Sequence, residues 1–349
     1  MKKYLILIAA VIFTGTATFA GNPDRAGQAG ASQLLINPWA KCSGWGGANV
    51  ASVRGLESNY LNIAGTAFTK KTELLFSNTQ WLAGTDIQIN AFGITQKIGK
   101  EGSGGVIGLS IMSMSMGEIP ITTVEQPEGG IGTFSPNLMN ISLSYAKAFS
   151  NSIYGGVNFR VINENVSDIK GQGMAIDAGI QYVTGEMENI KFGISLKNVG
   201  TRMKYNGDGL SFRGYVPGQA NAMTVAQRSS DFELPSLINI GGAYDFLFSE
   251  KHTLTLAGAF TSNSFTKDQY VGGLEYAFNK MFFLRCGYMY ETGNTNTAER
   301  TNVLTGINGG LSIALPVNKE KNSTIELDYS YRTSNPFNGV HSFGARINL

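Results

Sequence analysis

The chain has 349 residues, of which 44 are glycine, 11% are aromatic and only 15% are charged. Soluble globular proteins carry roughly 25% charged residues and about 7% glycine, so this composition is unusual for them. The mean hydropathy is close to zero, which excludes a bundle of membrane helices. The net charge of +2 comes without a basic run, so we expect no nucleic-acid partner.

Residues 1–20 have the pattern of a cleaved secretory signal peptide. Lys2 and Lys3 precede an apolar run from Tyr4 to Phe13, and small residues follow that run. The run is too short to span about 30 Å of hydrocarbon, which argues against a transmembrane anchor. The sequence therefore predicts Sec-type export of the mature chain.

A glycine-rich stretch, residues 37–65, precedes the first strand pattern and has little apolar periodicity. It fails the dinucleotide-binding fingerprint, because no strand pattern precedes its glycines and the G-x-G-x-x-G spacing is not met. We interpret residues 21–71 as a plug that folds into the following domain from the periplasmic side, with glycines that permit close backbone packing. The proposed plug residues are Asn37, Pro38, Gly44, Gly46, Gly47, Asn62, Ala64 and Gly65.

From residue 72 to residue 349 the sequence alternates apolar and polar residues in short segments. In residues 323–332, for example, Ile325 and Leu327 alternate with Glu326 and Asp328. Most segments have the roughly 9 to 11 residues that a tilted strand needs to cross a bilayer. The predicted strands are residues 72–81, 86–98, 104–116, 138–149, 152–165, 173–184, 190–202, 236–247, 252–263, 269–278, 281–291, 304–316, 323–332 and 341–349.

An even number of such strands is typical of single-chain barrels of the bacterial outer membrane. The sequence thus predicts an all-β fold: a membrane-spanning antiparallel β-barrel of about fourteen strands over residues 72–349, with an N-terminal plug. The long connections, residues 117–137, 203–235, 292–303 and 333–340, all alternate with short turns. Outer-membrane barrels have short periplasmic turns and longer extracellular loops, so the chain is expected to enter its first strand from the periplasm.

Charged side chains fall on one face of these strands and apolar side chains on the other. An arginine or lysine facing lipid at mid-depth costs about 2–4 kcal/mol, so the charged face is expected to line the lumen. A polar lumen of this width needs water or a plug to fill it. The expected lumenal charges are Arg160, Asp177, Glu275, Arg285, Glu326, Asp328, Arg332 and Arg346.

The sequence lacks the residues for common catalytic or metal sites. Its two histidines, His252 and His341, are predicted at opposite rims of the barrel, so they cannot share a site. Strand parity places Cys286 on the apolar face, away from Cys42 in the glycine-rich stretch, which favours two free thiols over a disulfide. We expect no enzyme activity, no metal and no cofactor.

The longest loop, residues 203–235, has apolar side chains scattered among polar ones. A loop of about 30 residues is uncommon unless it is functional. Two interpretations remain open, a lid over the barrel mouth and a partner-binding surface. The candidate partner-binding residues are Phe212, Tyr215, Met223 and Phe232.

The N-terminal stretch resembles the signature of the PorV/PorQ family of outer-membrane proteins, roughly I-N-P-x-A-(R/K)-x-x-(A/G)-M-G-x-A-x-V-A followed by an N-P-A-G-like element. Trp45 and Ile63 depart from the usual Met and Pro. The opening motif is closer to PorV, whereas the length of the chain is shorter than expected for PorV, which leaves a PorQ-like or paralogous member as an alternative. The matching residues are Ile36, Asn37, Pro38, Ala40, Lys41, Gly44, Gly46, Ala48, Val50, Ala51, Asn62, Ala64 and Gly65.

This resemblance implies a barrel similar to FadL-type transporters that serves type IX protein secretion. The implied partners are the type IX translocon, a cell-surface sortase complex and cargo proteins with C-terminal signal domains, bound through the extracellular loops. The alternative function is a FadL-like outer-membrane transporter of hydrophobic small molecules, in which the N-terminal segment gates the passage.

The last residues, "SFGARINL", resemble the C-terminal signal that the barrel-assembly machinery reads. Gly344, Ile347 and Leu349 occupy the glycine and apolar positions of that signal, although Leu349 replaces the more usual aromatic residue. The resemblance implies insertion into the lipid bilayer of the outer membrane by this machinery.

Overall fold

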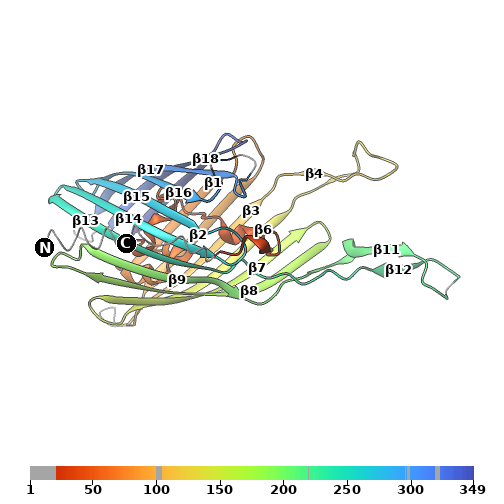
Figure 1. The fold of residues 1–349 in the computed structure, drawn as a ribbon, viewed down its shortest axis with the longest axis horizontal. Coiled ribbons are helices and arrows are strands. Elements are labelled where there is room, and N and C mark those ends of the chain that lie inside the picture. Colours follow the sequence, from red (N-terminus) through yellow and green to blue (C-terminus); the bar gives the residue numbers. More distant parts are fainter. Residues whose placement is uncertain (1–20, 100–103, 219, 295, 297–298, 319–322) are drawn as a thin grey trace.

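The computed structural model describes residues 21–99, 104–218, 220–294, 296, 299–318 and 323–349, and the predicted signal peptide at residues 1–20 lies outside them. Within these ranges, fourteen antiparallel strands form a closed barrel, as predicted (Figure 1). The barrel strands are β1 (Thr72–Gln80), β2 (Gln88–Lys97), β3 (Val106–Ser115), β6 (Asn137–Ala148), β7 (Ile153–Val166), β8 (Ile169–Thr184), β9 (Ile190–Gly200), β13 (Leu237–Ser249), β14 (His252–Asn263), β15 (Gln269–Phe278), β16 (Phe282–Glu291), β17 (Leu304–Asn318), β18 (Ser323–Ser334) and β19 (Val340–Asn348).

The sheet closes where the first strand meets the last. β1 pairs antiparallel with β19, with Leu75 opposite Arg346, and every other barrel strand pairs with the barrel strands before and after it in the chain. Closure satisfies the backbone hydrogen bonds of all strand edges, which a bilayer could not do. Among the described residues, no helix is long and apolar enough to cross a membrane.

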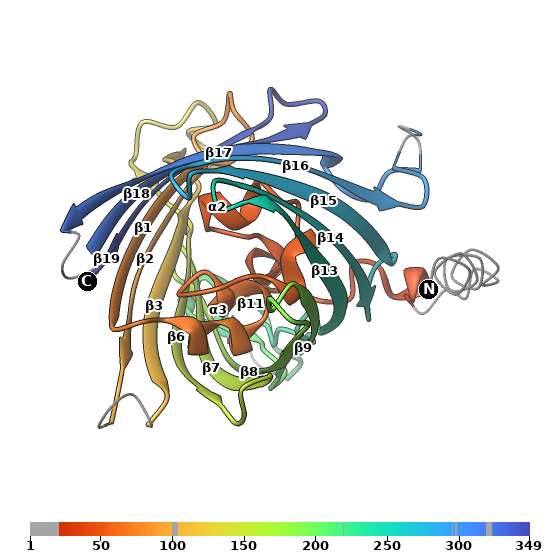
Figure 2. The same ribbon diagram turned by 90° about the vertical axis from the view of Figure 1, so that its left-hand side faces the viewer.

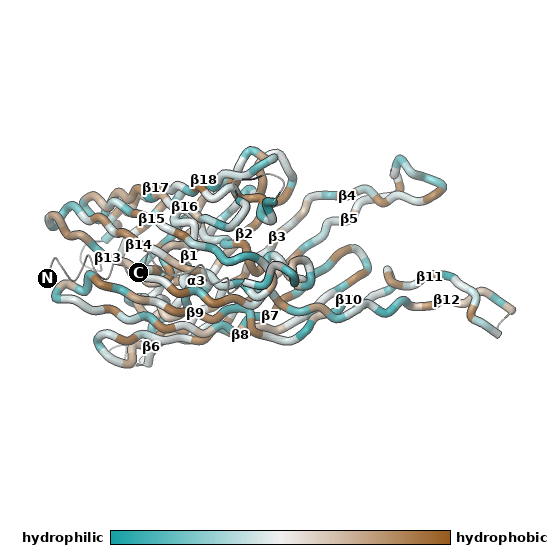
Figure 3. Tube along the Cα trace, in the orientation of Figure 1, coloured by the Kyte–Doolittle hydropathy of each residue, from teal (hydrophilic) through white to brown (hydrophobic). Residues whose placement is uncertain are grey.

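Hydrophobic and hydrophilic residues alternate along the barrel strands (Figure 3), and successive side chains of a strand point to opposite faces. In β9, Ile194 and Leu196 are exposed on the outside, whereas Ser195 and Lys197 are buried inside. The expected lumenal charges all lie on the inner face, which confirms the assignment of the two faces. Seven of them are buried, Arg160, Asp177, Arg285, Glu326, Asp328, Arg332 and Arg346, and Glu275 is half-buried.

The two ends of the barrel differ, and we call the end with the long loops the outer end and the end with the short turns the inner end. At the outer end, the loops contain short strands that sequence alternation missed, because two to four residues are too few to show a period. These are β4 (Ile119–Pro120), β5 (Thr133–Phe134), β10 (Tyr205–Asn206), β11 (Ser211–Gly214) and β12 (Met223–Ala226), with the 3-10 turn η6 (Asp208–Leu210).

Two hairpins project far beyond the barrel at this end, β4 with β5 and β11 with β12 (Figure 1). β10 instead pairs with the start of β8. β8 begins at Ile169, earlier than the predicted residue 173. The reason is its pairing with β7, which continues to the residue pair Val166 and Ile169.

Residues 21–71, which we call the N-terminal segment, contain only short helices and lie largely inside the ring of strands (Figure 2). Most side chains between residues 31 and 69 are buried. The helices of this segment are η1 (Pro23–Arg25), η2 (Ser32–Leu35), α2 (Ala40–Ser43), η3 (Ala48–Ala51), α3 (Ser58–Leu61) and η4 (Ile63–Phe68).

The N-terminal segment begins at the outer end, where Glu233 of the longest loop holds it. The backbone N of Gly30 donates a hydrogen bond to the carbonyl of Glu233 at 3.0 Å. The Glu233 carboxylate pairs with Arg25 at 3.1 Å and with Arg202 at 3.0 Å. The hydrogen bond from Arg25 lowers the pKa of the Glu233 carboxyl, so this ion pair is present at neutral pH and is lost only in acid.

The segment then crosses the lumen and ends at the inner end. There the carbonyl of Thr72 accepts a hydrogen bond from the backbone N of Leu349. In between, the carbonyl of Asn37 lies 3.5 Å from Arg332, near the outer end of β18, whereas Glu57 pairs with Arg346, near the inner end of β19. The expectation that residues 37–65 sit on the periplasmic side is therefore wrong for the first part of this stretch.

An epitope inserted between Gly27 and Gln28 should be labelled by antibody on intact cells. Residues 26–28 are exposed at the outer end, and a Cβ added at Gly27 meets no atom within 4 Å. An insertion there interrupts only the exposed hydrogen bonds that Gln28 makes with Asp24 and Arg25. A matched insertion between Glu250 and Lys251, in the short turn after β13, should be labelled only after the outer membrane is permeabilised. Labelling of the first site only after permeabilisation would contradict this path of the chain.

Candidate functional site

The barrel wall meets the N-terminal segment directly at a belt of lumen-facing glycines. A Cβ added at Gly287 would lie 2.3 Å from the carbonyl oxygen of Trp45, and one at Gly179 would lie 2.2 Å from Oδ1 of Asn62. Both distances are shorter than any real contact, so these positions admit no side chain unless the segment moves. The other members of this glycine belt, each with an added Cβ at 3.2 Å or less from the segment, are Gly93, Gly156, Gly193, Gly241, Gly273, Gly310 and Gly344.

Asn62, Ala64 and Gly65, the second half of the predicted plug motif, hold the N-terminal segment against the barrel wall. Nδ2 of Asn62 donates to the carbonyls of Val50 and Ile180, both at 3.1 Å, and Oδ1 of Asn62 accepts from the backbone N of Ala64 at 3.2 Å. Ile180 belongs to β8, so one side chain joins two parts of the segment to a barrel strand. Ala64 is fully buried, and a Cβ at Gly65 would clash with the segment's own backbone.

The first half of the motif shapes the turn at the outer end of the segment. Oδ1 of Asn37 accepts from the backbone N of Trp39 at 3.0 Å, across the buried Pro38. Gly46 and Gly47 have φ values of 65° and 97°, a left-handed backbone that favours glycine. Gly44 packs against the backbone of β17. The structure thus gives these motif residues contacts that fold and seat the segment.

A buried ion network joins the segment to the wall near the inner end. Arg346 of β19 lies 3.1 Å from Glu57, 3.5 Å from Glu73 and 4.0 Å from Glu326, and Lys41 pairs with Glu326 at 2.7 Å. Glu57 and Lys41 belong to the segment, and the other three residues belong to the wall. Removing one member of a buried pair costs about 3–5 kcal/mol, because the other charge is left without a partner.

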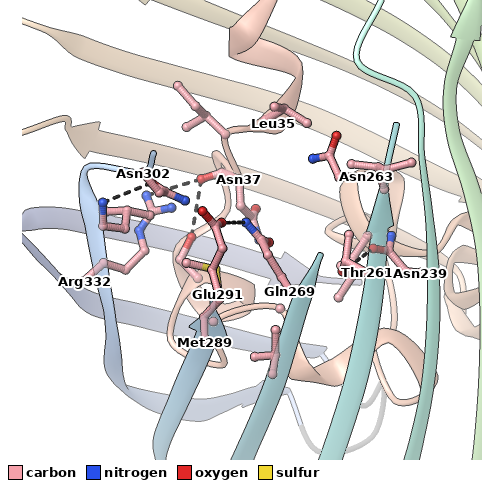
Figure 4. A pocket seen from close by; sticks show the side chains of 18 of the residues that line it. Leu35, Asn37, Asn239, Thr261, Asn263, Gln269, Met289, Glu291, Asn302 and Arg332 are labelled. Atoms are coloured by element: carbon pink, nitrogen blue, oxygen red, sulfur yellow. Dashed lines mark hydrogen bonds between the residues drawn. The ribbon is translucent and has the colours of Figure 1, made fainter. Parts of the chain in front are cut away.

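Above the glycine belt, a cavity of about 290 Å³ lies between the segment and the wall (Figure 4). On four strands, the next lumen-facing residue toward the outer end after the belt glycine, two positions along the strand, lines this cavity. These residues are Asn239 next to Gly241, Val271 next to Gly273, Met289 next to Gly287 and Asn308 next to Gly310. The belt is therefore the floor of the cavity.

The cavity lining mixes apolar and hydrogen-bonding side chains. Glu291 accepts hydrogen bonds from Gln269 at 2.9 Å and from Thr301 at 2.5 Å, and Thr261 donates to Asn239 at 2.8 Å. Further polar lining residues are Asn37, Ser43, Tyr60, Lys197, Asn263, Thr266, Asn302, Asn308 and Arg332. Apolar lining residues are Leu35, Ile36, Leu61, Trp81, Leu237, Val271, Met289 and Leu304.

The four predicted partner-binding residues do not lie together. Phe212 and Met223 are about half exposed on the β11–β12 hairpin, and Tyr215, which follows the last residue of β11, is 77% exposed. Phe232 instead packs against Tyr205, with ring centroids 5.3 Å apart and the rings tilted, and against the cluster around Ala31. Its backbone pairs with Met203 of the same loop, and its ring packs against Gly30 and Ala31, so Phe232 fastens the loop to the N-terminal segment.

The C-terminal residues divide between the two faces of the last strand. Gly344 faces the lumen as a member of the glycine belt, whereas Ile347 and Leu349 are exposed on the outside. Their recognition by the barrel-assembly machinery stays a prediction.

The histidines and cysteines are separate from the cavity. Nδ1 of His252 lies 2.6 Å from the hydroxyl of Tyr276, and Nδ1 of His341 lies 2.9 Å from that of Tyr329, at opposite ends of the barrel. Both cysteines are free, with Cys42 buried in the segment and Cys286 exposed on the outer face. Burial raises the pKa of the Cys42 thiol to about 12, so this thiol stays neutral and unreactive at physiological pH.

Sequence reasoning missed the cavity itself. Strand parity places Asn239 and Gln269 on the lumenal face. The glycines in the same strands and in neighbouring strands indicate how far along the barrel axis these two residues lie. Tyr60 of the segment carries no such signal, because only the fold of the segment brings it to the cavity.

No family model matches the chain, and no curated protein matches it in sequence. Solved structures match it in fold. A Pseudomonas aeruginosa FadL homologue has a TM-score of 0.53 at 10% identity, over 90% of this chain and 98% of that chain. The CymD monoaromatic hydrocarbon channel has a TM-score of 0.51 at 11% identity, over 90% and 97% of the two chains.

A third structure, the Pseudomonas putida toluene transporter TodX, has a TM-score of 0.50 at 12% identity, over 89% of this chain and 98% of that chain. Identities this low establish the fold alone. They agree with the FadL-like part of the sequence resemblance and do not test the PorV/PorQ assignment. The chain has the fold of FadL-like outer-membrane β-barrels.

Replacing Gly273 by alanine should lower the temperature at which the barrel unfolds, whereas replacing its neighbour Gly272 should not. A Cβ at Gly273 would lie 2.9 Å from the Trp45 ring and 3.0 Å from Ala48, and one at Gly272 meets nothing within 4 Å. Overpacking of this kind costs about 1–3 kcal/mol. The heat-induced mobility shift of the folded barrel on gels measures the effect, and equal midpoints for the two variants would show that the segment is not held at the glycine belt.

Proposed function

We propose that this protein is an outer-membrane channel of the FadL-like kind, which takes up small hydrophobic or amphiphilic molecules from the outside. The cavity above the glycine belt is the observation that carries this proposal. It lies at the outer end, beneath the long loops, and its lining combines apolar side chains with a few convergent polar groups, which is typical of small-molecule sites.

The surroundings of the cavity also fit a binding site for molecules that enter from outside. Thr266 and Asn302 come from loops at the outer end, whereas Tyr60 and Leu61 come from the N-terminal segment. A ligand in the cavity would touch both the loops and the segment. Its binding energy could therefore bias the position of the segment, which is how ligand binding shifts a conformational equilibrium.

The resemblance to the PorV/PorQ family supports a second candidate function, a component of type IX secretion that binds cargo or a surface complex. The projecting hairpins favour it, because they carry exposed apolar side chains such as Ile131, Tyr215 and Val124 far from the barrel. Where such groups gather into one contiguous patch, they are typical of surfaces that bind other proteins.

Filling the cavity tests the channel. Val271→Trp places a large ring in the cavity, whereas Tyr270→Trp changes the next residue of β15, which faces outward and is 48% exposed. Binding and vesicle uptake of toluene, benzamide and benzoate should be at least tenfold weaker for the first variant and unchanged for the second. Equal uptake by Val271→Trp, in a barrel that shows the normal heat-induced mobility shift, would exclude this cavity as the ligand site.

Removing one hairpin tests the secretion candidate. The carbonyl of Leu210 accepts a hydrogen bond from the backbone N of Gln227 at 2.9 Å, so a two-residue Asn-Gly turn can replace residues 211–226 without moving the barrel. The carbonyl of Gly132 accepts from the N of Ile121 at 2.8 Å, which allows the same deletion of residues 122–131 as a second variant. Loss of surface-anchored cargo on the first deletion is expected, and unchanged secretion with both hairpins removed would refute the candidate.

A further inference from the structure

The two hairpins that project from the outer end start at separate places on the barrel rim (Figure 1). We call residues 117–135, which contain β4 and β5, the acidic arm. We call residues 204–218 and 220–228, which contain β11 and β12, the basic arm. Strands β6 to β9 lie between the bases of the two arms. Neighbouring strands are about 4.8 Å apart, so the two bases are separated by about 20 Å along the wall.

The charged side chains of each arm are exposed and nearly all of one sign. The acidic arm has no lysine or arginine, and its carboxylates are Glu118, Glu125 and Glu128. The basic arm has one carboxylate, Asp208, and its cations are Lys204, Arg213 and Arg228. Within the described part of the chain, none of these side chains forms an ion pair. A solvated surface usually mixes the two signs, so this separation gives each arm a potential of one sign.

Each arm also exposes apolar side chains beside its charges. Val124 of the acidic arm is 100% exposed, and Tyr215 of the basic arm is 77% exposed. The other large apolar side chains exposed on the arms are Ile119, Ile121, Ile131, Phe212, Val216 and Met223. Burial of apolar surface drives most protein association, and tyrosine is a frequent anchor of interfaces. Both arms therefore have apolar groups that a partner could bury.

Unlike arms fit one another, whereas like arms do not. Two acidic arms placed side by side would repel, and so would two basic arms, because like charges that face each other across an interface cost free energy. The acidic arm and the basic arm instead match in charge. Copies of a barrel that are inserted into a membrane in the same direction carry their arms on the same side, so the acidic arm of one copy can lie along the basic arm of the next.

We infer that this protein associates with further copies of itself through these arms, the acidic arm of one copy binding the basic arm of its neighbour. The carboxylates of the first arm face the cations of the second, and the exposed apolar side chains pack between them. Each contact joins two different surfaces, so association continues into a row or closes into a ring. The inference is independent of the channel function, because neither arm lines the cavity.

The mass of the purified folded barrel tests the inference. At low salt, light scattering should give a mass above that of one copy. The protein concentration at which half of the copies associate should rise at least about tenfold in 1 M salt, where the Debye length is about 3 Å and exposed charges are screened. A barrel that stays a single copy at low salt would overturn the inference and leave the arms to a different protein.

Reversing the charges tests whether the two arms bind each other. Glu125→Lys with Glu128→Lys makes both arms positive, and Arg213→Glu with Arg228→Glu makes both arms negative. Each double variant should associate at least about tenfold more weakly than the original chain, whereas an equal mixture of the two should associate, because their arms are again of opposite sign. Both changes lie on exposed hairpins outside the barrel, and the heat-induced mobility shift checks that each variant is folded.

A matched reversal at the inner end is the control. Glu186→Lys with Glu188→Lys makes the same change of charge in the exposed turn between β8 and β9 and should leave association unchanged. Association that persists in both arm variants, or that their mixture does not restore, would overturn the inference, because other surfaces would then carry the contact.

Cross-linking distinguishes contact between copies from contact within one copy. Val124→Cys and Tyr215→Cys are made in separate chains that also carry Cys286→Ser, while Cys42 is buried. A short bismaleimide should join the two kinds of chain when they are mixed in one membrane, and should join neither kind to itself. If a chain with both changes cross-links only within itself, the arms close over their own barrel mouth and the inference fails.

Discussion

Direct contact between the wall glycines and the backbone of the N-terminal segment is the constraint on which the rest of the structure depends. A barrel of fourteen strands has a lumen too wide for its own side chains to fill. Belt glycines such as Gly179 and Gly287 let the segment approach the strands closely enough for hydrogen bonds like that from Asn62 to Ile180. Buried carboxylates and arginines then find partners across this contact instead of water, as Glu57 and Arg346 do.

The same contact decides where open space remains. At the glycine belt the wall has no side chains, so the N-terminal segment contacts the strands directly. The next lumen-facing residues toward the outer end have side chains, and these keep the segment away from the wall. The cavity is the space so created, with Asn239 and Asn308 on the wall and Tyr60 on the segment. The belt that seats the segment thus also positions the candidate binding site, and places it near the outer end of the barrel.

The two proposed functions make different demands on the segment. A channel needs it to move, since the belt and the ion network around Arg346 close the lumen below the cavity. A docking protein of the secretion machinery needs it to stay, as a rigid base for the projecting hairpins. Glu233 joins the parts of the molecule on which the two functions depend. Its carboxylate pairs with Arg25 at the start of the N-terminal segment and with Arg202 at the base of the loop that contains β11 and β12. A ligand or a partner that disturbs one contact therefore acts on the other.

The sequence by itself determined the barrel. Alternation with a period of two places Ile194 and Lys197 on opposite faces whatever the rest of the chain does, and the cost of charge in lipid then decides which face is inside. Strand number, closure and the lengths of the connections follow from the same local pattern. The N-terminal segment has no such period, so its path from the outer end to the inner end was decided only by tertiary contacts, through glycines on nine different strands.

Tertiary structure also decided the candidate site. Lys197 and Arg332 were predictable as lumenal residues, but their positions beside the cavity, above the rings of Tyr60 and Trp81, depend on how the chain folds around them. Phe232 was expected on a partner-binding surface and instead packs against Tyr205, because the loop returns to the wall before it reaches β13. Local pattern specifies which face a residue occupies, whereas only the assembled barrel specifies its height and its neighbours.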